Sequence, residues 1–244
     1  MARSSGYAEN FSVSQFILQC GLICAVFGFW HSPVIQPLKL MVVLFHEMSH
    51  GLMALLSGGQ VHSVVLTADE GGACETSGGV ALMIVSAGYL GSMAMGGLML
   101  ILSRAKACVT LVYILLFMTL TAAIFTVLHD PYSRRFATGL AAAFLVLGFL
   151  VPTILGSLFL RMLGTVSCLY SIFDIYWDIL ATDRPGYTVE NDAVALARLT
   201  GIAPQAVGLL WLALSVLFFL VALKMMVLSD PRVSTSPKEA TATA

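Results

Sequence analysis

The sequence predicts an all-α polytopic membrane protein, with about six to seven transmembrane helices and a small β-hairpin or sheet at the membrane face. Of its 244 residues, 59% are hydrophobic and only 10% are charged, whereas soluble domains carry about 25% charged residues. Apolar runs recur along the whole chain, and about 20 apolar residues suffice to cross the core of a bilayer. The net charge of −1 and the scattered basic residues give no basis for nucleic-acid binding.

A single transmembrane domain is predicted over residues 13–228, between two polar ends. Residues 1–12 and 229–244 are polar, so both are predicted to be disordered. The domain contains seven apolar segments, which are residues 13–30, 38–57, 79–102, 107–128, 136–151, 158–180 and 204–228. Pro152 and Gly156 lie near the boundary of the fifth and sixth segments, which leaves the number of spans at six or seven.

The first two segments are followed by clear boundary signals. The first ends at Trp30, a residue type that suits the membrane–water interface. The second ends at Gly58-Gly59, which is a typical helix stop. The β-branched run "QVHSVVL" (60–66) comes next, followed by the glycine-rich "TADEGGACETSGG" (67–79). This pattern predicts a strand that enters a hairpin or short sheet.

The later segments carry signals for packing. Gly88, Ser92 and Gly96 recur at every fourth position of the third segment, so one face of that helix allows close approach of another helix. Residues 190–201 predict a short surface helix that ends at Gly201. The number of cysteines is odd, five, and four of them lie in apolar segments. We therefore interpret them as small buried apolar residues and not as a disulfide framework.

The second apolar segment contains the motif "HEMSH", with His46, Glu47 and His50 inside an apolar run. Two histidines four residues apart lie on one face of a helix, where both imidazoles reach one tetrahedral Zn²⁺. Glu47 is then free to accept a proton from a zinc-activated water. Because ionisable side chains are costly inside a bilayer, such residues are functional candidates. The motif therefore predicts one catalytic zinc ion.

A catalytic zinc ion normally has three protein ligands and one open position, so one ligand is missing from this motif. In "SIFDIYWDIL", Asp174 and Asp178 lie four residues apart in an apolar helical run. Either carboxylate could bind the metal, or the pair could bind it and orient a ligand histidine. Asp174 is favoured because it lies deeper from the polar end of the run, with Asp178 as the alternative.

These segments together resemble the site-2 protease family of intramembrane zinc metalloproteases, and in particular its compact B-like peptidase branch without a PDZ domain. The resemblance extends over most of the chain from about residue 40 to 215. The matching segments are "FHEMSHGLMALLSGGQV" (45–61), "SAGYLGS" (86–92), "SCLYSIFDIYWDIL" (167–180) and "ENDAVALARLTGI" (190–202).

The resemblance implies that His46 and His50 are zinc ligands and that Glu47 is the catalytic base. It also implies a third ligand from an aspartate of a later helix, which falls on Asp174. In this family the segment after the metal helix is expected to form a small sheet that receives an unwound substrate as an added strand. That role falls on Val61, Ser63 and Val65. An exposed strand edge suits it, because a helical peptide must be extended before it is cut.

The leading hypothesis is therefore a zinc-dependent endopeptidase that cuts a peptide bond in or near a transmembrane segment. Its partners would be the lipid bilayer and a membrane-protein or transmembrane-peptide substrate. Two alternatives remain open. A multi-pass metal or ion transporter would use the same histidines and aspartates along an ion path, although paired interrupted half-helices are absent from the sequence pattern. A non-proteolytic scaffold derived from the protease fold would bind its clients without cutting them.

Overall fold

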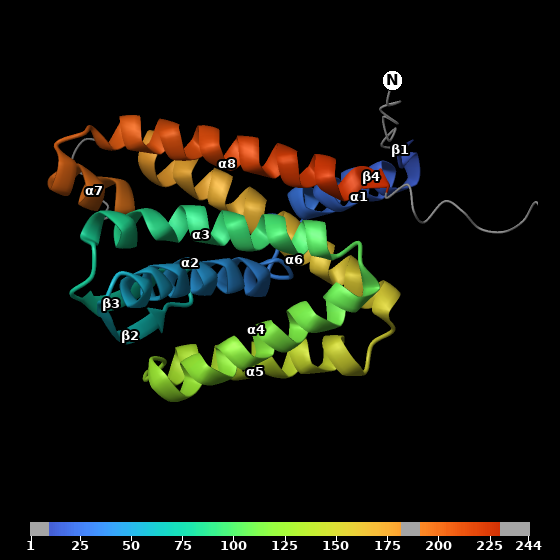
Figure 1. The fold of residues 1–244 in the computed structure, drawn as a ribbon, viewed down its shortest axis with the longest axis horizontal. Helices are drawn as coiled ribbons and strands as arrows, with labels where there is room; N and C mark the ends of the chain where they lie inside the picture. The colour runs from blue at the N-terminus through green and yellow to red at the C-terminus, as the bar shows by residue number, and fades with distance from the viewer. Residues whose placement is uncertain (1–9, 182–190, 230–244) are drawn as a thin grey trace, which may run out of the picture.

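In the computed structural model, which describes residues 10–181 and 191–229, the chain forms a helical bundle with one short hairpin beside it (Figure 1). The helices are α1 (Val13–Gly28), α2 (Gln36–Leu56), α3 (Ala81–Leu102), α4 (Lys106–Thr126), α5 (Pro131–Phe149), α6 (Thr153–Asp174), α7 (Asp192–Thr200) and α8 (Pro204–Val227). A π-helical turn, η1 (Ile175–Leu180), continues α6. The strands β2 (Gln60–Leu66) and β3 (Gly72–Ser77) pair with each other, as do β1 (Asn10–Phe11) and β4 (Leu228–Ser229).

Five helical segments of the described chain are long and apolar enough to cross a membrane: α2, α3, α4, α6 with η1, and α8. The predicted helical membrane class, with a hairpin after the second helix, is confirmed. All seven predicted apolar segments are helical, but two are not among these five spans. The helix α1 has only 16 residues, and α5 carries Arg134 and Arg135 in its first turns.

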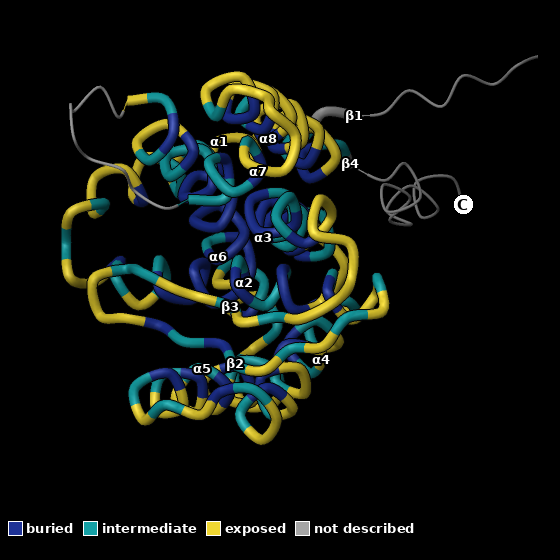
Figure 2. Tube along the Cα trace, turned by 90° about the vertical axis from the view of Figure 1, so that its left-hand side faces the viewer, coloured by how far each residue is buried: buried dark blue, intermediate teal, exposed yellow. Residues whose placement is uncertain are grey.

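The centre of the bundle is formed by α2, α3 and α6. Helix α3 packs against α2, α6 and α8, whereas α4 and α5 pack mainly against each other. Figure 2 shows that α2, α3 and α6 are largely buried, while α4, α5 and α8 have a long exposed side. Apolar side chains such as Leu115, Phe125 and Leu217 are exposed there, which suits contact with lipid. All five cysteines are free, as predicted, but only Cys168 is fully buried and Cys24 is exposed.

Helices α3 and α6 approach closely because glycine and serine line their contact. A Cβ on Gly164 would lie 2.6 Å from the carbonyl oxygen of Gly96. Ser167 donates a hydrogen bond to the carbonyl oxygen of Ser92 at 2.8 Å, and the hydroxyls of Ser92 and Ser171 are 3.0 Å apart. The small-residue face that the sequence predicts on the third segment is therefore the surface on which α6 packs.

We expect Gly164→Ala to destabilise the protein, because its methyl group would force α3 and α6 apart. Overpacking of this kind costs about 1–3 kcal/mol. Gly139→Ala is a matched control, since Gly139 is also helical and a Cβ there would meet no atom within 4 Å. Thermal unfolding in detergent should show a midpoint lower by several degrees for Gly164→Ala alone. Equal midpoints for both variants would contradict this packing.

The hairpin lies along α2, with its strands antiparallel and a register shift between Val61 and Ser63. Val64 and Leu66 are buried. Gly51 of α2 permits the contact, because a Cβ there would lie 3.2 Å from a methyl group of Val61. At the base of the hairpin, a Cβ on Gly59 would lie 2.8 Å from the carbonyl oxygen of Ser77. The hairpin is thus fixed to the helix that carries the histidine motif.

Candidate metal centre

His46 and His50 lie on the face of α2 that is turned toward α3. They come one helical turn apart, and their ring centroids are 4.8 Å apart. The edge of the Tyr89 ring from α3 contacts His46, with centroids 4.7 Å apart at 85°. The preceding residues 40–45 are all buried, so apolar packing fixes the helix that presents both imidazoles.

Gly88 of α3 has no side chain, and this leaves open the space into which the two imidazoles project. A Cβ on Gly88 would lie 2.3 Å from Nε2 of His46 and 2.5 Å from Nε2 of His50. Any side chain at this position would therefore fill the volume in front of both nitrogen atoms. The glycine face of α3 serves the site as well as the helix packing.

The carboxylate that faces the imidazoles belongs to Asp192, the first residue of α7. Its Oδ2 lies 3.0 Å from Nε2 of His46 and 3.3 Å from Nε2 of His50. The ligand atoms of these three residues all lie within 4.8 Å of one another. Among the described residues, no other group of three or more His, Cys, Asp or Glu side chains is placed to hold a metal ion.

The preceding residue, Asn191, fixes the start of α7. Its side chain accepts a hydrogen bond from the backbone N–H of Val194 at 3.0 Å, which is an N-cap interaction. Its Nδ2 also donates to the carbonyl oxygen of Asp178 at 2.9 Å. Asn191 therefore ties α7 to η1, and this holds Asp192 at the imidazoles.

The hydrogen bonds at this site fit a metal with nitrogen and oxygen ligands. Nδ1 of His50 is 2.7 Å from the carbonyl oxygen of Ile84, so Nδ1 donates to this carbonyl and Nε2 is the nitrogen that faces the site. Such a carbonyl partner is typical of metal-binding histidines. Among the described residues, the buried Oδ2 of Asp192 meets no hydrogen-bond donor other than the two facing imidazoles. Two imidazole nitrogens and one carboxylate oxygen are a common ligand set for catalytic zinc.

The charge state of Asp192 also fits this role. Burial by itself would raise the pKa of Asp192, but the attraction of the two facing imidazoles outweighs burial and holds it well below its usual range. The carboxylate is therefore ionised at neutral pH, as a metal ligand must be.

Glu47 lies beside this cluster and is enclosed by the start of β3. Its exposed fraction is 7%. A Cβ on Gly72 would lie 2.6 Å from Oε1 of Glu47, so only glycine lets the strand pass this close. A cavity of about 250 Å³ opens here, and its lining includes His46, Glu47, Gly72 and Asp192. The Glu47 carboxylate, the three potential metal ligands and a strand therefore meet in one cavity.

Asp174 and Asp178 line the same cavity but are not part of the three-residue cluster. The sequence predicts that one of them supplies the third ligand. In the structure, it is instead Asp192 that lies at the two imidazoles. The predicted short helix is α7, Asp192–Thr200, and it ends at Gly201 with φ 76°. Sequence reasoning did not single out Asp192, because an aspartate in the first turn of a helix is an ordinary pattern.

The three residues predicted to bind substrate lie in β2, and none of them lines this cavity. Ser63 donates to Glu75 at 3.2 Å, and the N–H of Val64 donates to the carbonyl oxygen of Val127 at 2.9 Å. Strand β2 is therefore bonded on both sides. In the part of the chain that the structure describes, β3 has no backbone partner other than β2. The open edge is that of β3, next to Glu47.

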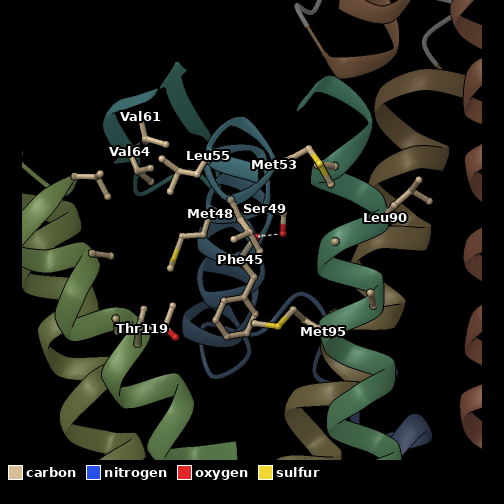
Figure 3. Close-up of a pocket in the computed structure, with 18 of the residues that line it drawn as sticks. Phe45, Met48, Ser49, Met53, Leu55, Val61, Val64, Leu90, Met95 and Thr119 are labelled. Carbon is tan, nitrogen blue, oxygen red and sulfur yellow. Dashed lines mark hydrogen bonds between the residues drawn. The ribbon is translucent and has the colours of Figure 1, made fainter. Parts of the chain in front are cut away.

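A second, larger cavity of about 960 Å³ lies on the opposite side of α2, between α3 and α4 (Figure 3). Its lining is apolar or hydroxyl-bearing, as the labelled Phe45, Met48, Met95 and Thr119 illustrate. It contains no histidine and no acidic or basic side chain. Of these two cavities, the smaller, polar one is therefore the one lined by histidine and acidic side chains.

Comparison with known proteins gives one match. The family described as Peptidase M50B-like matches residues 19–222 of the chain. No curated protein and no solved structure matches. The matched range contains α2, α3, α6, η1 and α7, and therefore every residue of the cluster and of the polar cavity.

Proposed function

Since the chain belongs to the Peptidase M50B-like family, which is the site-2 protease family, we propose that it is a zinc-dependent intramembrane endopeptidase. Its substrate would be a membrane protein, cut in or near a transmembrane segment. The chain would itself be a multi-pass integral membrane protein, in keeping with its five apolar spans. The observation that carries the proposal is the position of Glu47 beside two imidazoles and the carboxylate of Asp192.

The metal would be held by Nε2 of His46, Nε2 of His50 and Oδ2 of Asp192. Bound zinc supplies Lewis-acid chemistry, because it polarises the scissile carbonyl and makes water a nucleophile at neutral pH. Glu47 accepts a proton from the attacking water and passes it to the leaving amine. Gly72 has no side chain and therefore leaves room for the Glu47 carboxylate, which its backbone shields on one side.

Substrate would be bound in an extended form along the open edge of β3. The edge begins at Gly72, which is in contact with Glu47, so a strand added there would pass directly by the catalytic carboxylate. Backbone hydrogen bonds to a free strand edge hold a peptide extended without requiring a particular sequence. This assigns to β3 the role that the sequence suggested for Val61, Ser63 and Val65 of β2.

Asp174 and Asp178 would complete the polar cavity as neighbours of the metal centre and not as its ligands. Both face the cavity from the end of the span formed by α6 and η1. Carboxylates at this place are able to accept hydrogen bonds from an extended substrate backbone.

Removal of the metal tests the proposal. We expect the purified protein to contain about one zinc ion per chain and to cut single-span reporter proteins in vesicles. A chelator should reduce cleavage to background, and added Zn²⁺ should restore it, because Glu47 has no activated water without the metal. Mass spectrometry of the products locates the cut. Cleavage that survives complete removal of zinc, or zinc flux across the vesicles without cleavage, would contradict the proposal.

A further inference from the structure

The tip of the hairpin, residues 67–71, forms part of the wall of the polar cavity. Glu70, Gly71 and Gly72 all line that cavity. Gly72 follows the tip directly and is the residue in contact with Glu47. A displacement of the tip would therefore move the backbone that encloses the catalytic carboxylate and would move the start of the open strand edge.

Two side chains from the first turns of α2 hold this tip. Nζ of Lys39 lies 3.3 Å from Oε1 of Glu70, and these side chains are only 12% and 29% exposed. Nε2 of Gln36 donates to the carbonyl oxygen of Ala68 at 3.0 Å. Lys39 also lies over the ring of Trp30, 4.8 Å from its centroid. The tip is thus attached to the same helix that carries the histidines.

The position of Lys39 along α2 relates the ion pair to the site. Residues 39 and 46 are seven apart, so they lie on one face of the helix, about 10 Å apart along its axis. A lysine in an apolar span is costly unless it is paired. Glu70 and the ring of Trp30 supply that pairing beside the cavity.

The backbone of Glu70 points to the same conclusion. Glu70 has a φ of 69°, and it is the only non-glycine residue with a positive φ among the described residues. This conformation is unfavourable for a residue with a Cβ, and glycine would adopt it more easily. Two glycines follow directly in the sequence. A glutamate at this place therefore indicates that its carboxylate is used, and its partner is Lys39.

We propose that Lys39 and Glu70 form a clamp that holds the hairpin tip on α2 and thereby keeps Gly72 over Glu47. Both are positioning residues, and their effect on cleavage rests on the proposed peptidase function. Without the clamp, the metal cluster stays intact, because α3 and α7 hold it. Only the wall next to Glu47 and the start of the β3 edge become loose.

Three variants test the clamp: Lys39→Met, Glu70→Gln, and the charge-swapped double variant Lys39→Glu with Glu70→Lys. Asp69→Asn is the control for Glu70→Gln, since Asp69 is exposed on the same tip and forms no ion pair with any of the described residues. Lys106→Met, at the exposed start of α4, is the control for Lys39→Met. The experiment uses the full chain in detergent, loaded with zinc.

The first readout is hydrogen–deuterium exchange of the backbone amides of residues 67–72, which does not depend on activity. We expect exchange about three- to fivefold faster in both single variants, as for loss of an ion pair of ordinary strength. The second readout is cleavage of a reporter protein, for which kcat should fall by more than KM rises, because only the start of the β3 edge is loosened, while bound zinc stays unchanged. The swapped variant should restore both in part, because it restores the ion pair but not the contact of Lys39 with the Trp30 ring.

Three results would overturn the clamp. They are unchanged exchange at the tip in both single variants, acceleration spread evenly over the whole chain, and no recovery in the swapped variant. The two proposals fail separately. If zinc-loaded wild-type protein cuts no reporter, the peptidase function fails, and the exchange measurement still decides whether Lys39 and Glu70 hold the tip.

Discussion

Replacement of Glu47 by glutamine is expected to abolish peptide hydrolysis while zinc stays bound. Glutamine has nearly the same shape as glutamate, so α2 and the two imidazoles keep their positions. It cannot accept the proton of the attacking water, and loss of a general base typically lowers the rate by about 10²–10⁴-fold. Cleavage of a reporter protein in vesicles and zinc content per chain measure the two effects separately.

Asp69→Asn is the control for this change, because it also replaces an acid by its amide but lies on the exposed hairpin tip. It should cleave at the wild-type rate. If Glu47→Gln retained cleavage with zinc bound, the carboxylate next to Gly72 would not be the base, and the role assigned to this cavity would be wrong. Parallel loss of zinc would instead indicate that Glu47 supports the metal cluster.

The histidine pair could be predicted from the sequence because its geometry is local. In a helix, residues 46 and 50 come together whatever the rest of the chain does. The same holds for the helical spans and for the small-residue face with Gly88, which follow from composition and periodicity. These predictions depend on contacts within one helical turn or within one segment.

The third carboxylate could not be predicted in this way because its position depends on packing between remote segments. Asp174 and Asp178 drew attention since they lie in an apolar helix, where an acid is costly. Asp192 begins a short amphipathic helix, where an acid is ordinary. It reaches the imidazoles because α7 packs on α3 and α8 and because Asn191 ties α7 to η1. Nothing in the local pattern of residues 190–201 indicates that contact.

The strand edge that we propose for substrate differs from the predicted one for a related reason. The β-branched run of β2 is a clear strand signal, whereas "GACETS" of β3 is not. Which of two paired strands keeps an open edge is decided by the rest of the fold. Here Val127, just after α4, bonds to Val64 and occupies the outer side of β2. The strand with the weaker sequence signal is therefore the one that remains open.

Replacement of Asp192 by asparagine is expected to remove the metal. The change keeps the size of the side chain and its place at the start of α7, but it replaces a charged oxygen ligand by a neutral amide. Loss of groups that merely orient ligands lowers metal affinity about 10–100-fold, so loss of a ligand should reduce it by at least about 100-fold. Zinc content after dialysis and competition with a chelator of known affinity measure the effect without any peptidase assay.

Asp174→Asn and Asp178→Asn are the matched controls, because they make the same change in two carboxylates of the same cavity. Both should keep about one zinc ion per chain, since neither residue belongs to the cluster with His46 and His50. Loss of zinc in Asp174→Asn, with zinc retained in Asp192→Asn, would return the third ligand to α6. The contact between Asp192 and the two imidazoles would then be an ion pair and no part of the metal centre.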